Sequence, residues 1–185
     1  MIETIKKILR DHPALVVSGF YVAASAIGMF YSWAFLREFG INVFNYAQIS
    51  DFLVASLKEP FTWGLVLIAL VLAWLDDRSS LRYARRENRS KWLAWYGSPR
   101  YRFLNNFAVI ALVAFYIYVF AWDQARDVRD GDGKVVDVMF ADSGAATTAL
   151  LLGTTGQFVF LYDDRTERVD IHPIENIHSI SFRAP

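Results

Sequence analysis

Few side chains in this sequence have the types and spacing of a metal site. His172, Glu175 and His178 carry metal-ligating groups at steps of three residues. Pro173 interrupts any helix that would align them, and no second cluster in the sequence completes a coordination shell. We therefore interpret this group as structural and predict no bound metal.

The stretch DGDGK, residues 130–134, has the look of the start of a calcium-binding loop. An EF-hand loop needs oxygen ligands at its first and last positions. With Gly133 as the loop glycine, those positions fall on Val128 and Met139, which cannot coordinate calcium. The stretch predicts a tight turn.

Catalysis is the function class that the sequence supports least. The chain contains no cysteine, which excludes thiol nucleophiles, disulfides and cysteine–metal chemistry. The sequence has no phosphate-binding glycine loop, and no spacing that brings a base next to a serine nucleophile. We predict a non-enzymatic protein with no catalytic residues and no cofactor.

The most regular polar spacing belongs to small or hydroxylated residues inside an apolar stretch. Small residues let helices approach closely in lipid, and hydroxyl groups can replace the hydration shell of an ion. The sequence leaves three interpretations open: packing within one subunit, a seam between copies in a homo-oligomer, or the lining of a pore. The residues recur at steps of three and four: Ser18, Tyr21, Ser25, Gly28 and Ser32.

Three apolar stretches supply the helices that would carry such positions. The chain has 185 residues, of which 55% are hydrophobic and 16% aromatic, above the usual range of soluble domains. A spanning helix needs roughly 20 mostly apolar residues. We predict membrane spans at about 13–36, 61–76 and 104–122. Their apolar interiors carry no charged group, which disfavours proton-coupled transport.

The distribution of charge predicts which side of the membrane each segment occupies. Basic residues precede the first span and crowd the link between the second and third, whereas the chain after Trp122 has six basic and eleven acidic residues. Short loops rich in lysine and arginine remain in the cytoplasm. We therefore predict a multi-pass protein of a bacterial-type inner membrane. Its N-terminus is cytoplasmic and its C-terminal domain is extracytoplasmic.

The cytoplasmic segment 77–103 is predicted to contain a basic helix. Such a helix suits the anionic headgroups of the cytoplasmic leaflet or a cytoplasmic effector protein. The alternative is that its charge only sets the topology of the spans. The residues that would bind lipid or a partner are Arg82, Arg85, Arg86, Arg89 and Lys91.

The outer segment 39–60 alternates apolar and polar residues with a helical period. We predict an amphipathic helix that rests in the outer membrane interface. The alternative is a re-entrant segment that dips between the spans, because irregular backbone at depth is tolerated inside protein or a cavity. In that case Asn45, Gln48 and Asp51 would lie near a channel mouth.

The remainder, residues 123–185, is predicted to form a small β-rich domain after a transmembrane domain at 1–122. Short runs of alternating hydrophobicity predict strands at 134–140, 148–152, 156–162, 168–172 and 178–183. So small a core is expected to lean on the membrane, on the outer segment or on a neighbouring copy. Its acidity disfavours nucleic acid as a partner.

The expected fold class is thus a membrane protein with an all-α transmembrane region. It has three spans, an interfacial or re-entrant outer helix and a small extracytoplasmic β-domain. The leading functional hypothesis is a homo-oligomeric small channel or gated sensor. The alternative is a membrane-anchored sensor or scaffold subunit that recruits a cytoplasmic effector, of an envelope-stress or phage-defence type.

Overall fold

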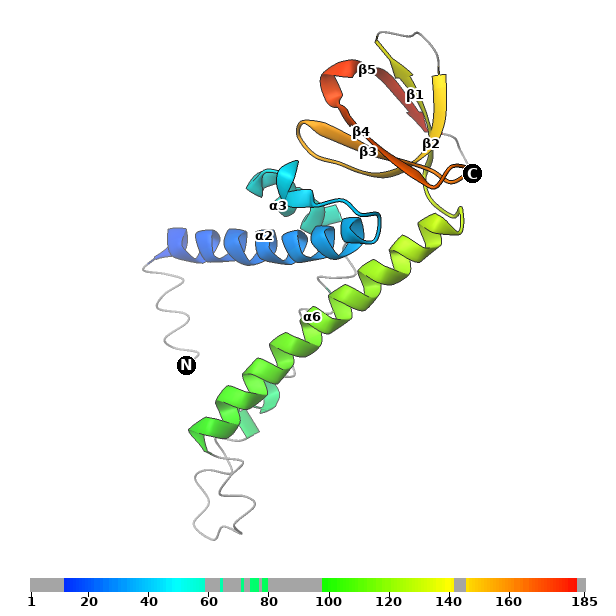
Figure 1. The fold of residues 1–185 in the computed structure, drawn as a ribbon. Helices are drawn as coiled ribbons and strands as arrows, with labels where there is room; N and C mark the ends of the chain where they lie inside the picture. Colours follow the sequence, from blue (N-terminus) through cyan, green and yellow to red (C-terminus); the bar gives the residue numbers. More distant parts are fainter. Residues whose placement is uncertain are drawn as a thin grey trace. The chain divides into compact units, whose positions relative to one another are not determined.

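The computed structural model describes residues 12–58, 64, 71, 74–76, 78–79, 98–141 and 146–182 (Figure 1). Packing divides the chain into two compact units: Met1–Lys58 with Phe120–Pro185, and Glu59–Val119. We call them unit 1 and unit 2. This division follows contacts within the chain, so it does not test the predicted boundary between residues 122 and 123.

Two helices are long and apolar enough to cross a membrane: α2 (Pro13–Arg37) with 25 residues and α6 (Pro99–Arg129) with 31. At 1.5 Å per residue they measure about 37 and 46 Å, against a hydrocarbon core of about 30 Å. Only 18% of the most apolar window of α2 and 6% of that of α6 is buried within the chain. Both helices are compatible with membrane association.

After each helix the chain turns at a glycine in the left-handed backbone conformation. Gly40 has a φ of 74° and Gly131 a φ of 93°, values that side chains disfavour. After α2, Ile41 N–H donates to the carbonyl of Leu36 (3.0 Å), and after α6, Asp132 N–H donates to that of Asp127 (3.0 Å). These six-residue bonds belong to the Schellman motif, which satisfies the last carbonyls of a helix.

The start of α6 differs from the expected one. The Ser98 Oγ accepts a hydrogen bond from Tyr101 N–H (3.2 Å), and Pro99 occupies the first turn, which is a typical helix start. The helix α6 therefore begins before the predicted span 104–122 and includes residues 99–103. Arg100 and Arg102 are unfavourable in lipid, so the predicted span began after them. Arginine is nevertheless favourable in a helix, and the helix therefore includes both residues.

The predicted second span, 61–76, and the predicted cytoplasmic segment, 77–103, lie mostly outside the described residues. Residues 64, 71 and 74–76 are described, and they are helical. Three spans are therefore not shown.

The outer segment is not one continuous helix. It begins with turns and a single 3-10 turn, η1 (Val43–Asn45), and only then forms the helix α3 (Ile49–Lys58). The Asn42 side chain accepts from Phe44 N–H (3.3 Å) at the start of η1. Asparagine favours such local turns over a helix interior, which accounts for the break.

The C-terminal residues form a five-stranded antiparallel sheet, close to the predicted strands. The strands are β1 (Val135–Phe140), β2 (Ala146–Thr154), β3 (Phe158–Asp163), β4 (Arg168–Pro173) and β5 (Ile177–Phe182). Their order in the sheet is β4-β3-β2-β1-β5. A 3-10 turn, η2 (Ile174–Asn176), joins the last two strands.

The sheet is strongly curled (Figure 1). The edges of a flat five-stranded sheet lie about 19 Å apart, at about 4.8 Å per strand. Only η2 joins β4 to β5, the two edge strands, and so short a link spans at most about 14 Å. Curling brings the edges within reach. It also encloses a core of the buried residues Val136, Val138, Val159 and Leu161.

Candidate functional site

The end of α2, the segment that follows it, the end of α6 and strand β3 share one hydrophobic core in unit 1. Phe160, only 1% exposed, belongs to this core, and Phe39, Tyr46 and Ala47 of the segment pack against it. We call this set of contacts the junction. Of the three supports expected for the small β-domain, the structure contains the outer segment. The buried residues of the junction are Ala34, Phe35, Leu36, Ile41, Val43, Phe52, Ala121, Ala125 and Phe160.

Strand β3 can serve two cores because successive side chains point to opposite faces of a strand. Val159 and Leu161 face the interior of the curled sheet, and Phe160 faces the junction. Aromatic rings extend this second face. The centroid of Phe39 lies 5.2 Å from that of Tyr162, and that of Tyr46 lies 5.3 Å from that of Phe158, both edge to face.

A polar contact closes one side of the junction. Arg129 Nη2, in the last turn of α6, lies 3.3 Å from Glu38 Oε2 and donates a hydrogen bond to the Glu38 carbonyl. The guanidinium carbon also lies 5.4 Å from the centroid of the Phe39 ring, in cation–π geometry. One arginine therefore binds a carboxylate, a backbone carbonyl and a ring, and it ties the end of α6 to the end of α2.

Asp51 closes another side of the junction. Its Oδ2 accepts from Gln48 N–H (2.7 Å), which caps the first turn of α3, as an acidic third residue does in a capping box. Its Oδ1 accepts from Gly156 N–H (3.0 Å) in the turn between β2 and β3. The carboxylate thus links α3 to the sheet through two charge-assisted hydrogen bonds.

The other two residues predicted for an outer mouth or interface have smaller roles in the described structure. Gln48 is exposed and contributes its backbone N–H to the cap of α3. Asn45 is exposed at the end of η1. The chain brings Gln48 and Asp51 together, while a position at a channel mouth remains a prediction.

The stripe of small and hydroxylated residues divides into two parts along α2. Ser25 and Gly28 are buried, whereas Ser18 and Tyr21 are exposed and Ser32 is half-buried. A Cβ on Gly28 would overlap the carbonyl oxygen of Phe52 and lie 2.9 Å from Ser56 N, both in α3. The buried part of the stripe, Ser25 and Gly28, therefore packs within the chain, where Gly28 lets the backbones of α2 and α3 touch.

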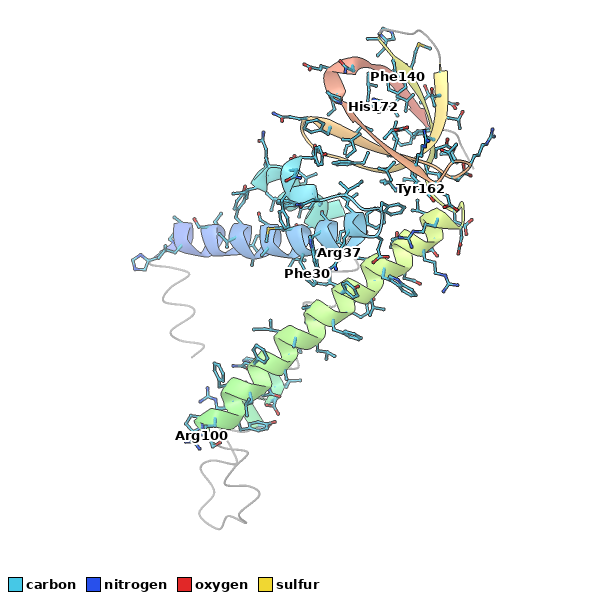
Figure 2. All side chains as sticks on the ribbon, viewed as in Figure 1. Phe30, Arg37, Arg100, Phe140, Tyr162 and His172 are labelled. Carbon is cyan, nitrogen blue, oxygen red and sulfur yellow. The ribbon has the colours of Figure 1, made fainter. Side chains whose placement is uncertain are left out.

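The basic residues predicted to bind lipid or an effector, Arg82, Arg85, Arg86, Arg89 and Lys91, lie outside the described residues. At the other end of the chain, the ring of His172 lies 4.6 Å from the Phe140 ring, centroid to centroid (Figure 2). Within the described ranges no three His, Asp or Glu side chains gather as metal ligands do.

A polar cluster in unit 2 joins the helical residues near position 76 to α6. Asp76 Oδ2 accepts from Asn105 Nδ2 (2.9 Å), and the Tyr101 hydroxyl lies 3.4 Å from Asp76 Oδ1. Tyr101 and Asn105 are four residues apart and so share a face of α6. The cluster fastens the end of the predicted second span to the start of α6.

An open pocket of about 350 Å³ lies where α2 ends. Trp33 and Arg37 enter it from one face of the helix, and the returning chain forms its other wall. The guanidinium carbon of Arg37 lies 5.1 Å from the centroid of the Trp33 ring. The lining residues are Trp33, Arg37, Gly40, Ile41, Asn42 and Phe44.

The sequence predicted that the β-domain leans on the outer segment, but it did not identify the core residues of the junction, the pair of Glu38 with Arg129 or the cluster at Asp76. All three join residues that are distant in sequence, and only Asp76 carried a local signal, as a carboxylate next to a predicted span. The observed arrangement fixes helix ends to a sheet. No known protein family, curated protein or solved structure matches the chain.

Proposed function

We propose that this protein is a non-enzymatic, membrane-anchored sensor subunit. Its C-terminal β-domain lies outside the cytoplasm, and the junction transmits the state of that domain to the membrane helices. A cytoplasmic effector, recruited through the basic segment 77–97, would be the output. The observation that carries this proposal is the shared core of Phe160 with the ends of α2 and α6.

The exposed apolar surface of the two long helices supports the membrane anchor. Core helices of soluble proteins bury most of their apolar side chains. Here Phe107, Leu112 and Phe115 of α6 are at least 63% exposed within the chain, as are Leu15 and Val17 of α2. Lipid is the environment in which such surfaces are favourable.

The direction of the two helices supports three crossings. Both α2 and α6 contribute their C-terminal ends to the junction, since Ala34 and Phe35 pack there with Ala121 and Ala125. Two helices that cross a bilayer and emerge on the same side need one return crossing between them. The apolar stretch at 61–76 is the segment of the chain suited to it.

The rigid seating of the sheet supports a sensing role over a tethering one. A domain on a flexible linker turns independently of its anchor and passes no strain to it. In this chain β3 is packed on both faces, and Asp51 and Arg129 add polar ties at two sides of the same core. Any shift of the sheet therefore moves the helix ends, because packed cores deform as units.

A homo-oligomeric channel or gated sensor is the second candidate. It is favoured by Ser18 and Tyr21, the N-terminal part of the hydroxylated stripe, which are exposed on α2. A pore built there would need a ring of copies, each contributing α2.

Labelling of single cysteines tests the topology without background, since the chain has no cysteine of its own. Ser179→Cys in β5 should react with a membrane-impermeant maleimide in intact cells. Ser90→Cys should react only after permeabilisation. Equal labelling of both positions in intact cells would overturn the proposed arrangement.

The output is tested by two sets of substitutions that separate the candidates. Replacing Arg85, Arg86 and Arg89 by alanine should abolish cross-linking to a cytoplasmic partner and leave conductance unchanged, as expected for a sensor. Ser18→Leu, on the exposed part of the stripe, should abolish conductance if the protein is a channel. Loss of conductance with retention of the partner would favour the channel over the sensor.

A further inference from the structure

The charged side chain of Arg37 lies in the last turn of α2, next to the junction. Its neighbour in sequence, Glu38, binds Arg129. Among the described residues no carboxylate lies within ion-pair distance of Arg37, whose side chain is exposed at the mouth of the pocket. The pocket therefore presents a positive charge that no described carboxylate compensates.

The hydrogen-bond donors of Arg37 have no acceptor among the described residues. The guanidinium carbon lies 5.1 Å from the centroid of the Trp33 ring, and the Trp33 ring is itself stacked against Phe30 at 5.7 Å between centroids. The N–H groups of a guanidinium form a fork that matches the oxygens of a phosphate. Trp33 and Phe30 thus position the Arg37 guanidinium as a phosphate-binding group.

The opposite wall of the pocket combines a second donor with an apolar surface. The Asn42 side chain uses Oδ1 to accept from Phe44 N–H, so its amide N–H₂ remains a donor. Phe44 is 51% exposed beside it. One pocket therefore offers a cation, an amide donor and two aromatic surfaces, which is the chemistry of a charged head attached to an apolar chain.

We propose that this pocket binds the phosphodiester headgroup of an anionic phospholipid on the extracytoplasmic side of the membrane. The inference rests on the proposed function, since it needs α2 to cross the bilayer. Trp33 and Arg37 stand in the last two turns of that helix, at the depth where headgroups lie. The volume of about 350 Å³ suits a headgroup rather than a whole lipid. Binding there would link lipid composition to the junction, which begins at Ala34.

The experiment uses the full-length protein in detergent micelles and native mass spectrometry to follow lipid binding. The probes are phosphatidylglycerol and a glucosyl diacylglycerol with the same acyl chains but no phosphate. The variant is Arg37→Gln, and its matched control is Arg126→Gln, which removes another exposed arginine of unit 1. Wild type and Arg126→Gln should bind phosphatidylglycerol alike. Arg37→Gln should bind it about tenfold more weakly, the loss expected for charge-assisted hydrogen bonds.

Further arms identify the source of the phosphate and the role of the fork. Inorganic phosphate should fail to displace the lipid, and the glucosyl lipid should bind weakly to every variant. Arg37→Lys should retain only part of the affinity, because a lysine cannot form the two-pronged contact. Displacement by inorganic phosphate would assign the site to a free anion and overturn the lipid. Equal binding by Arg37→Gln and wild type would overturn the site.

Flotation with phosphatidylglycerol vesicles in a density gradient separates this inference from the proposed function. If wild type fails to float, the membrane anchor itself is wrong. If wild type and Arg37→Gln both float but bind the lipid equally, the anchor holds and only the headgroup site is overturned.

Discussion

The carboxylate of Glu38, at the end of α2, binds the guanidinium of Arg129, 91 residues later at the end of α6. The pair is one of the two long-range polar contacts that close the junction, and the same guanidinium lies against Phe39. It fixes the two helix ends at one point. The side chain of Arg129 is 41% exposed and that of Glu38 is 21% exposed, so the charge attraction is partly screened by solvent.

We expect a double-mutant cycle of Glu38→Gln and Arg129→Met to show a coupling energy of about 1 kcal/mol or less in the free energy of unfolding. Arg129→Met alone should cost more than Glu38→Gln, because it also removes the ring contact. The matched control is Arg126 with Asp130, an ion pair with both side chains more than 60% exposed, which should show no coupling. Equal coupling energies in the two cycles would contradict a special role for Arg129.

Gly28 is predicted to be essential for the contact between α2 and α3. Gly28→Ala would push a methyl group into the carbonyl of Phe52, so the helices must separate. We expect a loss of about 1–3 kcal/mol in stability, as for an overpacked core. Gly19→Ala in the same helix is the control, since nothing lies within 4 Å of a Cβ there. Thermal unfolding in detergent measures both; a Gly28→Ala protein as stable as Gly19→Ala would show that the helices do not touch.

Local signals in the sequence were enough for most of the elements. Pro13 and Arg37 bound α2 within a residue of the expected span, and the period-two pattern of residues such as Val169 and Ile171 located β4. These features depend on neighbours along the chain, so sequence reasoning reaches them.

The junction could not be predicted because its parts are not neighbours. The sequence analysis placed Asp51 at an outer mouth or interface, and nothing near it in the sequence identifies Gly156 as its partner. Phe160 likewise reads as any strand residue, although its burial depends on Ile41 and Val43. Contacts of this kind are set by the tertiary fold, so the local propensities of the sequence do not predict them.

Glu167 adopts the left-handed backbone conformation in the turn between β3 and β4, with a φ of 52°. A residue with a side chain costs about 1 kcal/mol there relative to glycine. We expect Glu167→Gly to raise the stability of the protein or leave it unchanged, whereas Glu167→Val should lower it, since β-branched residues disfavour positive φ most. Arg165→Gly, in the same turn at a negative φ, should be destabilising. A stabilising Arg165→Gly would refute the explanation from backbone strain.

The same turn predicts a dependence of stability on pH. The hydrogen bond from Thr166 Oγ1 (2.8 Å), followed by that from Arg165 N–H (3.0 Å), lowers the pKa of the Asp163 carboxyl. A pKa that is lower in the folded state stabilises the fold above the unfolded value of about 3.9, and this contribution is lost as the pH falls through the folded value.

Thr166→Ala should therefore raise the pKa of Asp163 in a carboxyl NMR titration. Its destabilisation should be present at neutral pH and shrink as the pH falls through the folded pKa of Asp163. Thr147→Ala, an exposed threonine of β2, is the control and should leave the titration unchanged. An unaltered pKa in Thr166→Ala would assign the shift to the backbone instead.

Ser25 distinguishes packing within the chain from a seam or a wetted path. Its side chain is 7% exposed, and its Oγ finds no hydrogen-bond partner among the described residues. A buried hydroxyl without a partner costs about 1–3 kcal/mol, so Ser25→Ala should stabilise an isolated chain by about 1 kcal/mol. Ser18→Ala, at an exposed position of the same helix, should change little. If Ser25→Ala instead destabilises the protein, the hydroxyl has a partner in a neighbouring copy or in bound water, and the oligomeric interpretation of the stripe gains over intrachain packing.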